Sequence, residues 1–249
     1  IDVMGSRKDS TIKIVTDYKQ KEKKGMPARF LFECAIKLKM KPLTSATAAV
    51  LFHRFYKDAE SNEYDPYMIA SSCIYLAAKI KDDPVKIRDV INVAHNTINR
   101  TSQPLDLGDE YWAMRDTIVQ AELLITRVLK FDLTTSHPHK YMLHYMKTLQ
   151  DWFGQNEWNQ LPIARTAAAY LQDFHHSSNI LKYKPSHIAI CCISLALQSY
   201  GVQVPLTDEN DENTIWYQVF VKDLTKEKHW EIMEEIMEVY NREGDIDGN

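Results

Sequence analysis

The chain has little glycine, and none of it forms the loops that bind phosphates in nucleotide enzymes. Only 7 of 249 residues are glycine. No P-loop, GxGxxG or GxSxG pattern occurs among them. Glycine lowers helix stability, so its scarcity suits a helical protein. The sequence therefore favours helices and offers no recognised catalytic motif, and we expect the chain not to be an enzyme.

Cysteine is also scarce, and its spacing does not indicate a metal or disulfide framework. The four cysteines show no CxxC pair; they are Cys34, Cys73, Cys191 and Cys192. On apolar helix faces a free thiol packs as a small hydrophobic side chain. This usage is typical of a reducing compartment, so we expect a nuclear and/or cytoplasmic protein.

Nine histidines are present, but none lies in a recognised metal-binding motif. No HExxH pattern occurs, and no histidine is followed directly by aspartate. We expect His137 and His139 to diverge around Pro138 at a helix start, with a capping and linker role. His175 and His176 are expected at a helix end, where a cation suits the helix dipole. Metal binding is the less favoured alternative, so we predict no metal and no cofactor.

No apolar run is long enough to cross a bilayer. The longest, Ile188 to Leu197, is half of the required length, and the N-terminus lacks the continuous apolar core of a signal peptide. We expect no membrane partner.

Charge is distributed unevenly along the chain. Residues 1–41 carry 11 Lys/Arg against 5 Asp/Glu, whereas residues 208–249 carry 4 against 13. We expect residues 1–26 to form a flexible basic leader and residues 242–249 an acidic tail. The middle of the chain is nearly balanced, at 15 against 16. Because DNA binding needs clustered basic residues, direct contact with nucleic acid is not expected.

What the chain does contain is an internal repeat at an offset of 119 residues. The identical pairs are Thr47-Ala48-Ala49 with Thr166-Ala167-Ala168, Phe55 with Phe174, Tyr64 with Tyr183, Pro66 with Pro185, and Ile69-Ala70, Cys73-Ile74 and Leu76-Ala77 with Ile188-Ala189, Cys192-Ile193 and Leu195-Ala196. This offset is too long for a solenoid repeat. It predicts two similar domains. The copies differ in charge at Lys79, which aligns with Gln198.

The spacing of apolar residues is helical throughout, and no strand-like alternation persists. We predict an all-α fold of two tandem five-helix domains, over residues 27–135 and 136–241. In the first copy, the expected helices cover residues 28–40, 66–81 and 85–94, with another that begins after a Thr44-Ser45 cap and ends at 58, and a long last helix that ends at 130. In the second copy, they cover residues 139–152, 160–176, 185–200, 214–222 and 225–240. Polar residues 95–110 form an insert that only the first copy has.

Several motifs in this layout resemble the cyclin family. Leu76-Ala77-Ala78-Lys79 closes one helix, and Glu122 to Leu133 closes another. His53-Arg54-Phe55-Tyr56 and His137-Pro138-His139 are similar to the transcriptional cyclins. Within those, the stretch from Arg127 to Trp152 resembles the cyclin Q subfamily, also called cyclin M, whose partner is cyclin-dependent kinase 10. The resemblance covers about residues 28–240 and implies tandem cyclin boxes.

The resemblance also implies a kinase-binding site in the first box. Lys79 and Glu122 match the lysine and glutamate with which cyclins hold the αC helix of the kinase. Ile80, Phe131 and Leu133 match apolar contact positions. An internal Lys79–Glu122 pair is an alternative interpretation of the two charges, and burial within the box is an alternative for Phe131. Thr126 departs from the family pattern, because it is polar where an apolar residue is common.

The resemblance implies that the chain forms a heterodimer with a cyclin-dependent kinase and activates it allosterically. The favoured partner is cyclin-dependent kinase 10. A cyclin that binds the active kinase better than the inactive one shifts the population toward it. The alternative is a cyclin-fold transcription factor that binds promoter DNA or the transcription machinery without a kinase.

Overall fold

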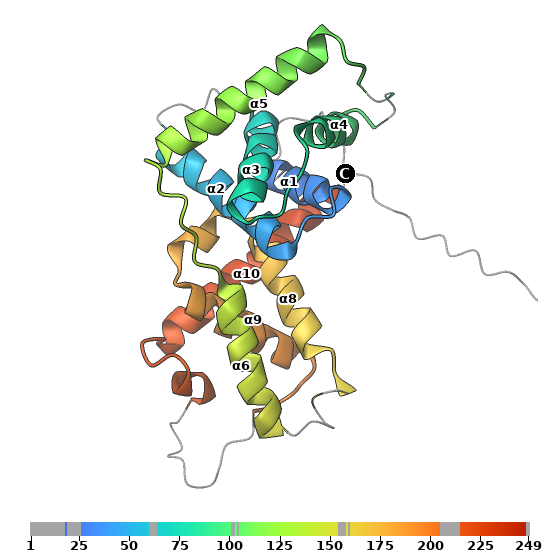
Figure 1. Cartoon of the computed structure of the whole chain (residues 1–249). Coiled ribbons are helices and arrows are strands. Elements are labelled where there is room, and N and C mark those ends of the chain that lie inside the picture. Colours follow the sequence, from blue (N-terminus) through green and yellow to red (C-terminus); the bar gives the residue numbers. More distant parts are fainter. Residues whose placement is uncertain are drawn as a thin grey trace, which may run out of the picture.

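The computed structural model describes Tyr18 and residues 26–59, 64–100, 103, 105–153, 158, 160–204 and 215–247. Within these ranges every regular element is a helix, as predicted. The helices form two bundles stacked end to end (Figure 1). The predicted leader, apart from Tyr18 and Met26, and the last two residues of the acidic tail lie outside the described residues.

The first bundle contains α1 to α5, with α3 at its centre. The helices are α1 (Met26–Lys37), α2 (Pro42–Asp58), α3 (Pro66–Ile80), α4 (Ile87–Ile98) and α5 (Asp109–Val128). α3 packs against all four of the others. Its apolar positions, including Ile69, Cys73 and Ile74, are almost fully buried. The thiol of Cys73 is free and buried, as predicted, and this burial raises its pKa.

The second bundle repeats this arrangement around α9. It contains α6 (Pro138–Phe153), α8 (Ile163–Phe174), η1 (Ser178–Lys182), α9 (Pro185–Ser199), η2 (Trp216–Val219) and α10 (Lys226–Asp247). Its apolar core is separate from that of the first bundle. The helix predicted over 214–222 is a short 3-10 turn among the residues described there. The boundaries at 27–135 and 136–241 stay a prediction.

The start of α2 differs from the prediction. Pro42 is the first helical residue and Lys41 the N-cap, and Lys41 provides no side-chain cap. The carboxylate of Asp83 instead accepts hydrogen bonds from Lys41 N at 2.8 Å and from Thr44 Oγ1 at 2.9 Å. A carboxylate here stabilises the helix start by binding a free N–H. The cap therefore comes from a residue about forty positions away.

Both α3 and α5 end in residues with left-handed backbone. Asp82 has φ 48° after α3, while Lys130 and Phe131 have φ 51° and 61° after α5. The amide of Asp83 then bonds to Ala78 O, and that of Phe131 to Thr126 O. These six-to-one hydrogen bonds are typical of a Schellman C-cap. None of the three residues is glycine, so both ends carry backbone strain.

Candidate functional site

Lys79 and Glu122 form an ion pair between two helices of the first bundle. Lys79 is in the last turn of α3 and Glu122 in the second half of α5. The Lys79 ammonium donates to both Glu122 carboxylate oxygens at 2.8 Å. It also lies 4.3 Å from the centre of the Tyr75 ring. The structure thus brings the two predicted charges together, as the internal-pair interpretation required.

The pair remains accessible from solvent on its lysine side. The Lys79 side chain is 50% exposed and that of Glu122 is 16% exposed. Such a pair contributes only about 0–1 kcal/mol to folding, because water already solvates the charges well. Contact with a protein partner would cover the ammonium without breaking a buried network.

Phe131 points out of the first bundle. Its side chain is 75% exposed, so burial within the bundle, the alternative interpretation, is wrong. The left-handed backbone of Lys130 and Phe131 turns the chain away from the helix axis. A strained residue that displays a large aromatic ring to solvent is a candidate contact for a partner.

Ile80 and Leu133 have a different environment from Phe131. Both are partly buried and pack against the apolar core of the first bundle. Each therefore offers only part of its surface to a partner, and part of its role is to hold the helix ends in place. Thr126, the departure from the pattern, donates to Glu122 O at 2.8 Å, so it satisfies its hydroxyl within α5.

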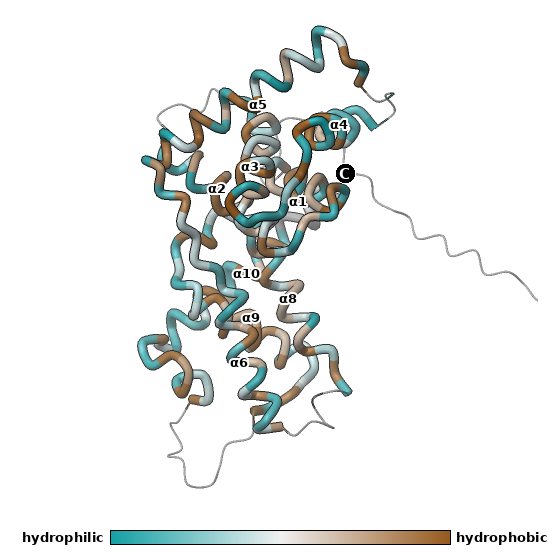
Figure 2. Tube along the Cα trace, in the orientation of Figure 1, coloured by the Kyte–Doolittle hydropathy of each residue, from teal (hydrophilic) through white to brown (hydrophobic). Residues whose placement is uncertain are grey.

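Further apolar side chains along α5 were not predicted as site residues. Leu123 is 56% exposed, and Trp112 and Val119 are also exposed. Hydrophilic and apolar positions alternate along the outer side of this helix (Figure 2). Leu123 directly follows Glu122 and could have been found from its position off the buried face of the helix. Together with Phe131, these residues make α5 an apolar outer edge.

The second bundle lacks the ion pair. At the offset of 119, Lys79 aligns with Gln198. The same offset takes Glu122 in α5 to Asn241 in α10, because α9 and α10 are about as far apart in the sequence as α3 and α5. Gln198 is exposed at the end of α9, and the Asn241 amide donates to Glu238. The two bundles therefore share a fold, but only the first presents paired charges at these positions.

Three histidines meet where the two bundles join. With one ring nitrogen taken from each, the ligand atoms of His137, His139 and His175 lie within 4.8 Å of one another. His137 and His139 thus do not diverge as predicted, because both rings turn toward His175. Burial also lowers the pKa of His175 to about 3. The cation predicted at this end of α8 is therefore a neutral ring, because desolvation outweighs the hydrogen bond to Leu171 O, which acts in the opposite direction.

No helix among the described residues combines the length and apolar character that a membrane span requires.

Comparison with known sequences places the chain among the cyclins. The family profile "Cyclin, N-terminal domain" matches residues 5–134. Human Cyclin-L1 is 32% identical over 211 residues, covering 83% of this chain and 38% of Cyclin-L1. Cyclin pch1 of Schizosaccharomyces pombe is 30% identical over 182 residues, covering 72% and 51%. The chain thus spans about two fifths to one half of these relatives.

Solved structures agree with this assignment at the level of the fold. A chain in the yeast RNA Pol II CTD kinase CTDK-1 complex superposes with a TM-score of 0.69 at 18% identity, covering 90% of this chain and 66% of that one. A chain of the yeast TFIIK (Kin28/Ccl1/Tfb3) complex gives 0.54 at 16% identity, covering 86% and 83%. With the profile match over more than half of its length, the chain belongs to the cyclin family.

Proposed function

We propose that the chain is a non-catalytic regulatory subunit that binds and activates a cyclin-dependent kinase. Family membership supports this, and a structural neighbour with the same fold comes from an RNA Pol II CTD kinase complex. A kinase of type 10 is the proposed partner, on the resemblance of residues 127–152 to cyclin Q. The name of the same neighbour, which includes RNA Pol II, supports a role in transcription and a nuclear location.

The observation that carries the proposal is the Lys79–Glu122 pair beside the exposed apolar edge of α5. The lysine keeps half of its surface in solvent, and Leu123 follows the glutamate with 56% of its surface exposed. Protein interfaces typically combine two features: an apolar surface that supplies contact area, and charged groups beside it that fix the relative position of the partners. In this proposal Lys79 and Glu122 fix the position of the kinase on the surface. The apolar contacts come from Ile80, Phe131 and Leu133.

The mechanism is a shift of population in the kinase. Productive ATP binding requires the ion pair between the β3 lysine and the αC glutamate of the kinase. In the proposed complex, Lys79 and Glu122 hydrogen-bond the kinase around αC, and Phe131 packs against it. The complex stabilises the active state by the difference between its affinities for the two states. All chemistry stays with the kinase.

A charge reversal provides the sharpest test. The double variant Lys79→Glu/Glu122→Lys retains an internal ion pair and hence its small contribution to folding. At each of the two positions, however, it presents the kinase with a charge of the opposite sign. We expect at least about 30-fold weaker binding to cyclin-dependent kinase 10, which corresponds to ~2 kcal/mol or more for truncating or reversing a buried charge contact. Phosphorylation of a peptide substrate should fall in parallel.

The matched control is Gln198→Glu/Asn241→Lys, at the equivalent positions of the second bundle. It should fold and bind the kinase as the wild type does. Equal loss in both double variants would contradict the assigned surface. Binding to another cyclin-dependent kinase but not to type 10 would correct the partner alone. No binding to any kinase of a panel would contradict the proposal and favour the transcription-factor alternative.

A further inference from the structure

Two of the three clustered histidines have a tautomer fixed by their hydrogen bonds. The Thr47 hydroxyl donates its one proton to Leu43 O at 2.7 Å, so at 2.9 Å it accepts from His137 Nε2–H. His175 Nδ1 lies 2.7 Å from Leu171 O, a carbonyl that only accepts, so Nδ1 carries the proton. His137 Nδ1 and His175 Nε2 are therefore lone-pair nitrogens.

Three ring nitrogens of the cluster, including these two, have no hydrogen-bond partner in the described part of the chain. His137 Nδ1, His139 Nδ1 and His175 Nε2 are all buried without a hydrogen bond among the described residues. His175 is fully buried, His137 is nearly so, and His139 is half-buried. An unpaired buried polar atom costs free energy, so three in one cluster need a physical explanation.

Protonation of the three rings does not explain their unpaired nitrogens. Burial lowers the pKa of His137 to about 4 and that of His175 to about 3, and it also lowers that of His139. Three positive charges within this distance would repel one another. At neutral pH the cluster is three neutral imidazoles, which is the form that binds a metal ion.

We propose that His137, His139 and His175 bind a divalent transition-metal ion of the zinc type where the two bundles join. Neutral imidazole is a preferred ligand of zinc, and His₃ with an open fourth position is an established coordination set. Thr47 Oγ1 and Leu171 O already hold the remote nitrogens of two ligands, as outer-shell groups do in histidine–metal sites.

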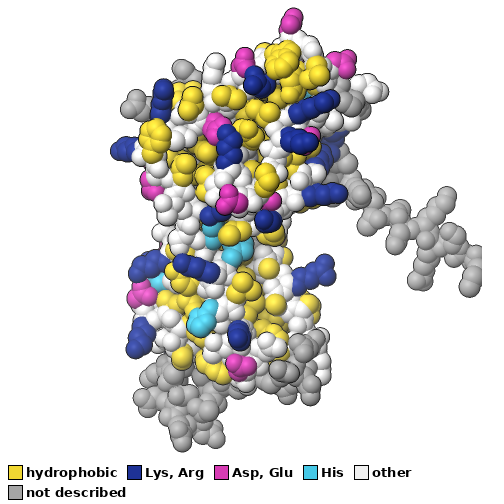
Figure 3. Space-filling view, in the orientation of Figure 1, with side chains coloured by type: hydrophobic (Ala, Val, Ile, Leu, Met, Phe, Trp, Pro, Cys, Tyr) yellow, Lys and Arg dark blue, Asp and Glu magenta, His cyan; other side chains and the backbone are white. Residues whose placement is uncertain are grey.

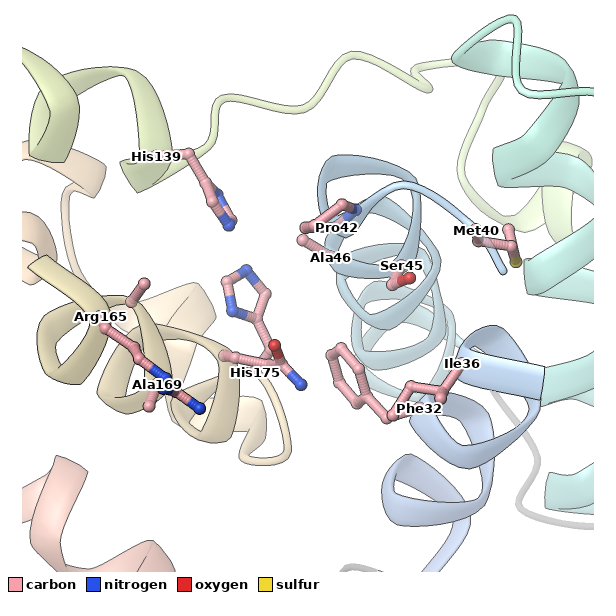
Figure 4. A pocket seen from close by; sticks show the side chains of 12 residues that line it. Phe32, Ile36, Met40, Pro42, Ser45, Ala46, His139, Arg165, Ala169 and His175 are labelled. Atoms are coloured by element: carbon pink, nitrogen blue, oxygen red, sulfur yellow. The ribbon is translucent and has the colours of Figure 1, made fainter. Parts of the chain in front are cut away.

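The surroundings leave room for a fourth ligand. A cavity of about 420 Å³ is lined by His139 and His175 together with Phe32, Ser45 and Arg165. The rings of His139 and His175 both line this cavity and point toward one another (Figure 4). The fourth position therefore opens toward solvent or a small anion, and no carboxylate lines this cavity.

Binding requires a small contraction. Nitrogens in a tetrahedral site at zinc distances lie about 3.4 Å apart, against a spread of up to 4.8 Å in the structure. His137 and His175 are fixed by their outer hydrogen bonds. The half-buried His139 can turn toward them, because its ring lies at the edge of the cavity.

The three ligands lie in the second bundle or directly before it, and hydrogen bonds connect two of them to the first. Thr47 belongs to α2 of the first bundle, whereas His175 follows α8 of the second. A second contact crosses the same boundary, since His53 Nε2 donates to His175 O at 2.8 Å. Histidine side chains are visible in the narrow waist of the molecule (Figure 3). A bound ion would therefore hold His137 and His175 in place, and with them the two hydrogen bonds to α2.

The test measures metal binding to the full chain after treatment with a chelator. We expect one equivalent of Co²⁺ to produce the visible absorption of a tetrahedral site, and one equivalent of Zn²⁺ to displace it. Zn²⁺ should also raise the thermal unfolding temperature, because an ion that binds only the folded state stabilises it. Neither readout depends on kinase activity, so this proposal can fail independently of the proposed function.

His139→Ala should abolish the Co²⁺ absorption and the Zn²⁺-dependent rise in unfolding temperature. It should still fold, because this side chain is half-buried and its Nδ1 is unpaired. Thr47→Val should weaken Zn²⁺ binding by about ten-fold or more, as loss of an outer-shell partner does. His144→Ala, at an exposed position of α6, is the control and should behave as the wild type. No stoichiometric binding, or equal binding by His139→Ala, would overturn the proposal.

Discussion

Lys79 and Glu122 lie 43 positions apart in the sequence, and the ammonium of one contacts both carboxylate oxygens of the other at 2.8 Å. The pair connects the C-terminal turn of α3 to the side of α5, at the edge of the first bundle. It lies next to Leu123, on the apolar outer edge of α5, which is the surface that we propose as the kinase contact.

Single truncations of this pair should separate folding from binding. Lys79→Ala should change the free energy of unfolding by no more than about 1 kcal/mol, because the lysine is half exposed. Its affinity for the kinase should fall by at least about 30-fold. Urea unfolding and calorimetric titration measure the two quantities. A large loss of stability with unchanged affinity would show that the pair is purely internal.

Phe131→Gly should weaken binding to the proposed kinase without lowering stability. The backbone at φ 61° favours glycine, and the exposed ring contributes little to the core. We expect stability to stay constant or to rise by up to about 1 kcal/mol. Kinase affinity should fall with the loss of the aromatic contact. Lys130→Gly, at φ 51°, is the matched control: it relieves similar strain and should keep the affinity.

Asp83→Ala should destabilise α2, although Asp83 is outside that helix. Its carboxylate accepts from Lys41 N and Thr44 Oγ1, and these hydrogen bonds lower its pKa. Loss of a helix cap costs about 1 kcal/mol. Chemical denaturation would measure the change. Asp82→Asn, at the neighbouring position, is the comparison, because asparagine tolerates the left-handed backbone there. A cost for Asp83→Ala no greater than that for Asp82→Asn would contradict the capping role.

The protein should lose stability in mild acid. Burial lowers the pKa of His53 to about 4 and that of His175 to about 3, so between those values and about 6.5 the unfolded chain binds more protons than the folded one. The free energy of unfolding is fully retained above about pH 6.5. It should then fall with pH by up to about 1.4 kcal/mol per unit for each histidine.

Urea titrations between pH 7.5 and 4.5, with chelator present, would measure this slope. His53→Gln keeps a donor for His175 O but cannot titrate, so its slope should be smaller. His144→Gln, at an exposed position, should leave the slope unchanged. A flat profile for the wild type would contradict the neutral, buried state of these histidines.

The sequence predicted the fold because its signals are local or repeated. Asp65 and Pro66 predicted the start of α3, and the Asp65 carboxylate does accept from Tyr67 N at 3.0 Å. The repeat, with Phe55 and Phe174 fully buried at matching positions, predicted two bundles of similar architecture. Helical periodicity of the apolar residues is enough for both inferences, since it follows from burying one face of each helix.

Only the tertiary structure decided what depends on distant contacts. The cap of α2 comes from Asp83, the exposure of Phe131 follows from the left-handed end of α5, and the Lys79–Glu122 pair forms across two helices. His175 meets His137 and His139 from 38 and 36 positions away in the sequence, a spacing that no known motif marks as a site. Local patterns determine helices, but side-chain partners are set by how the helices pack, and a single sequence does not encode that packing in any short motif.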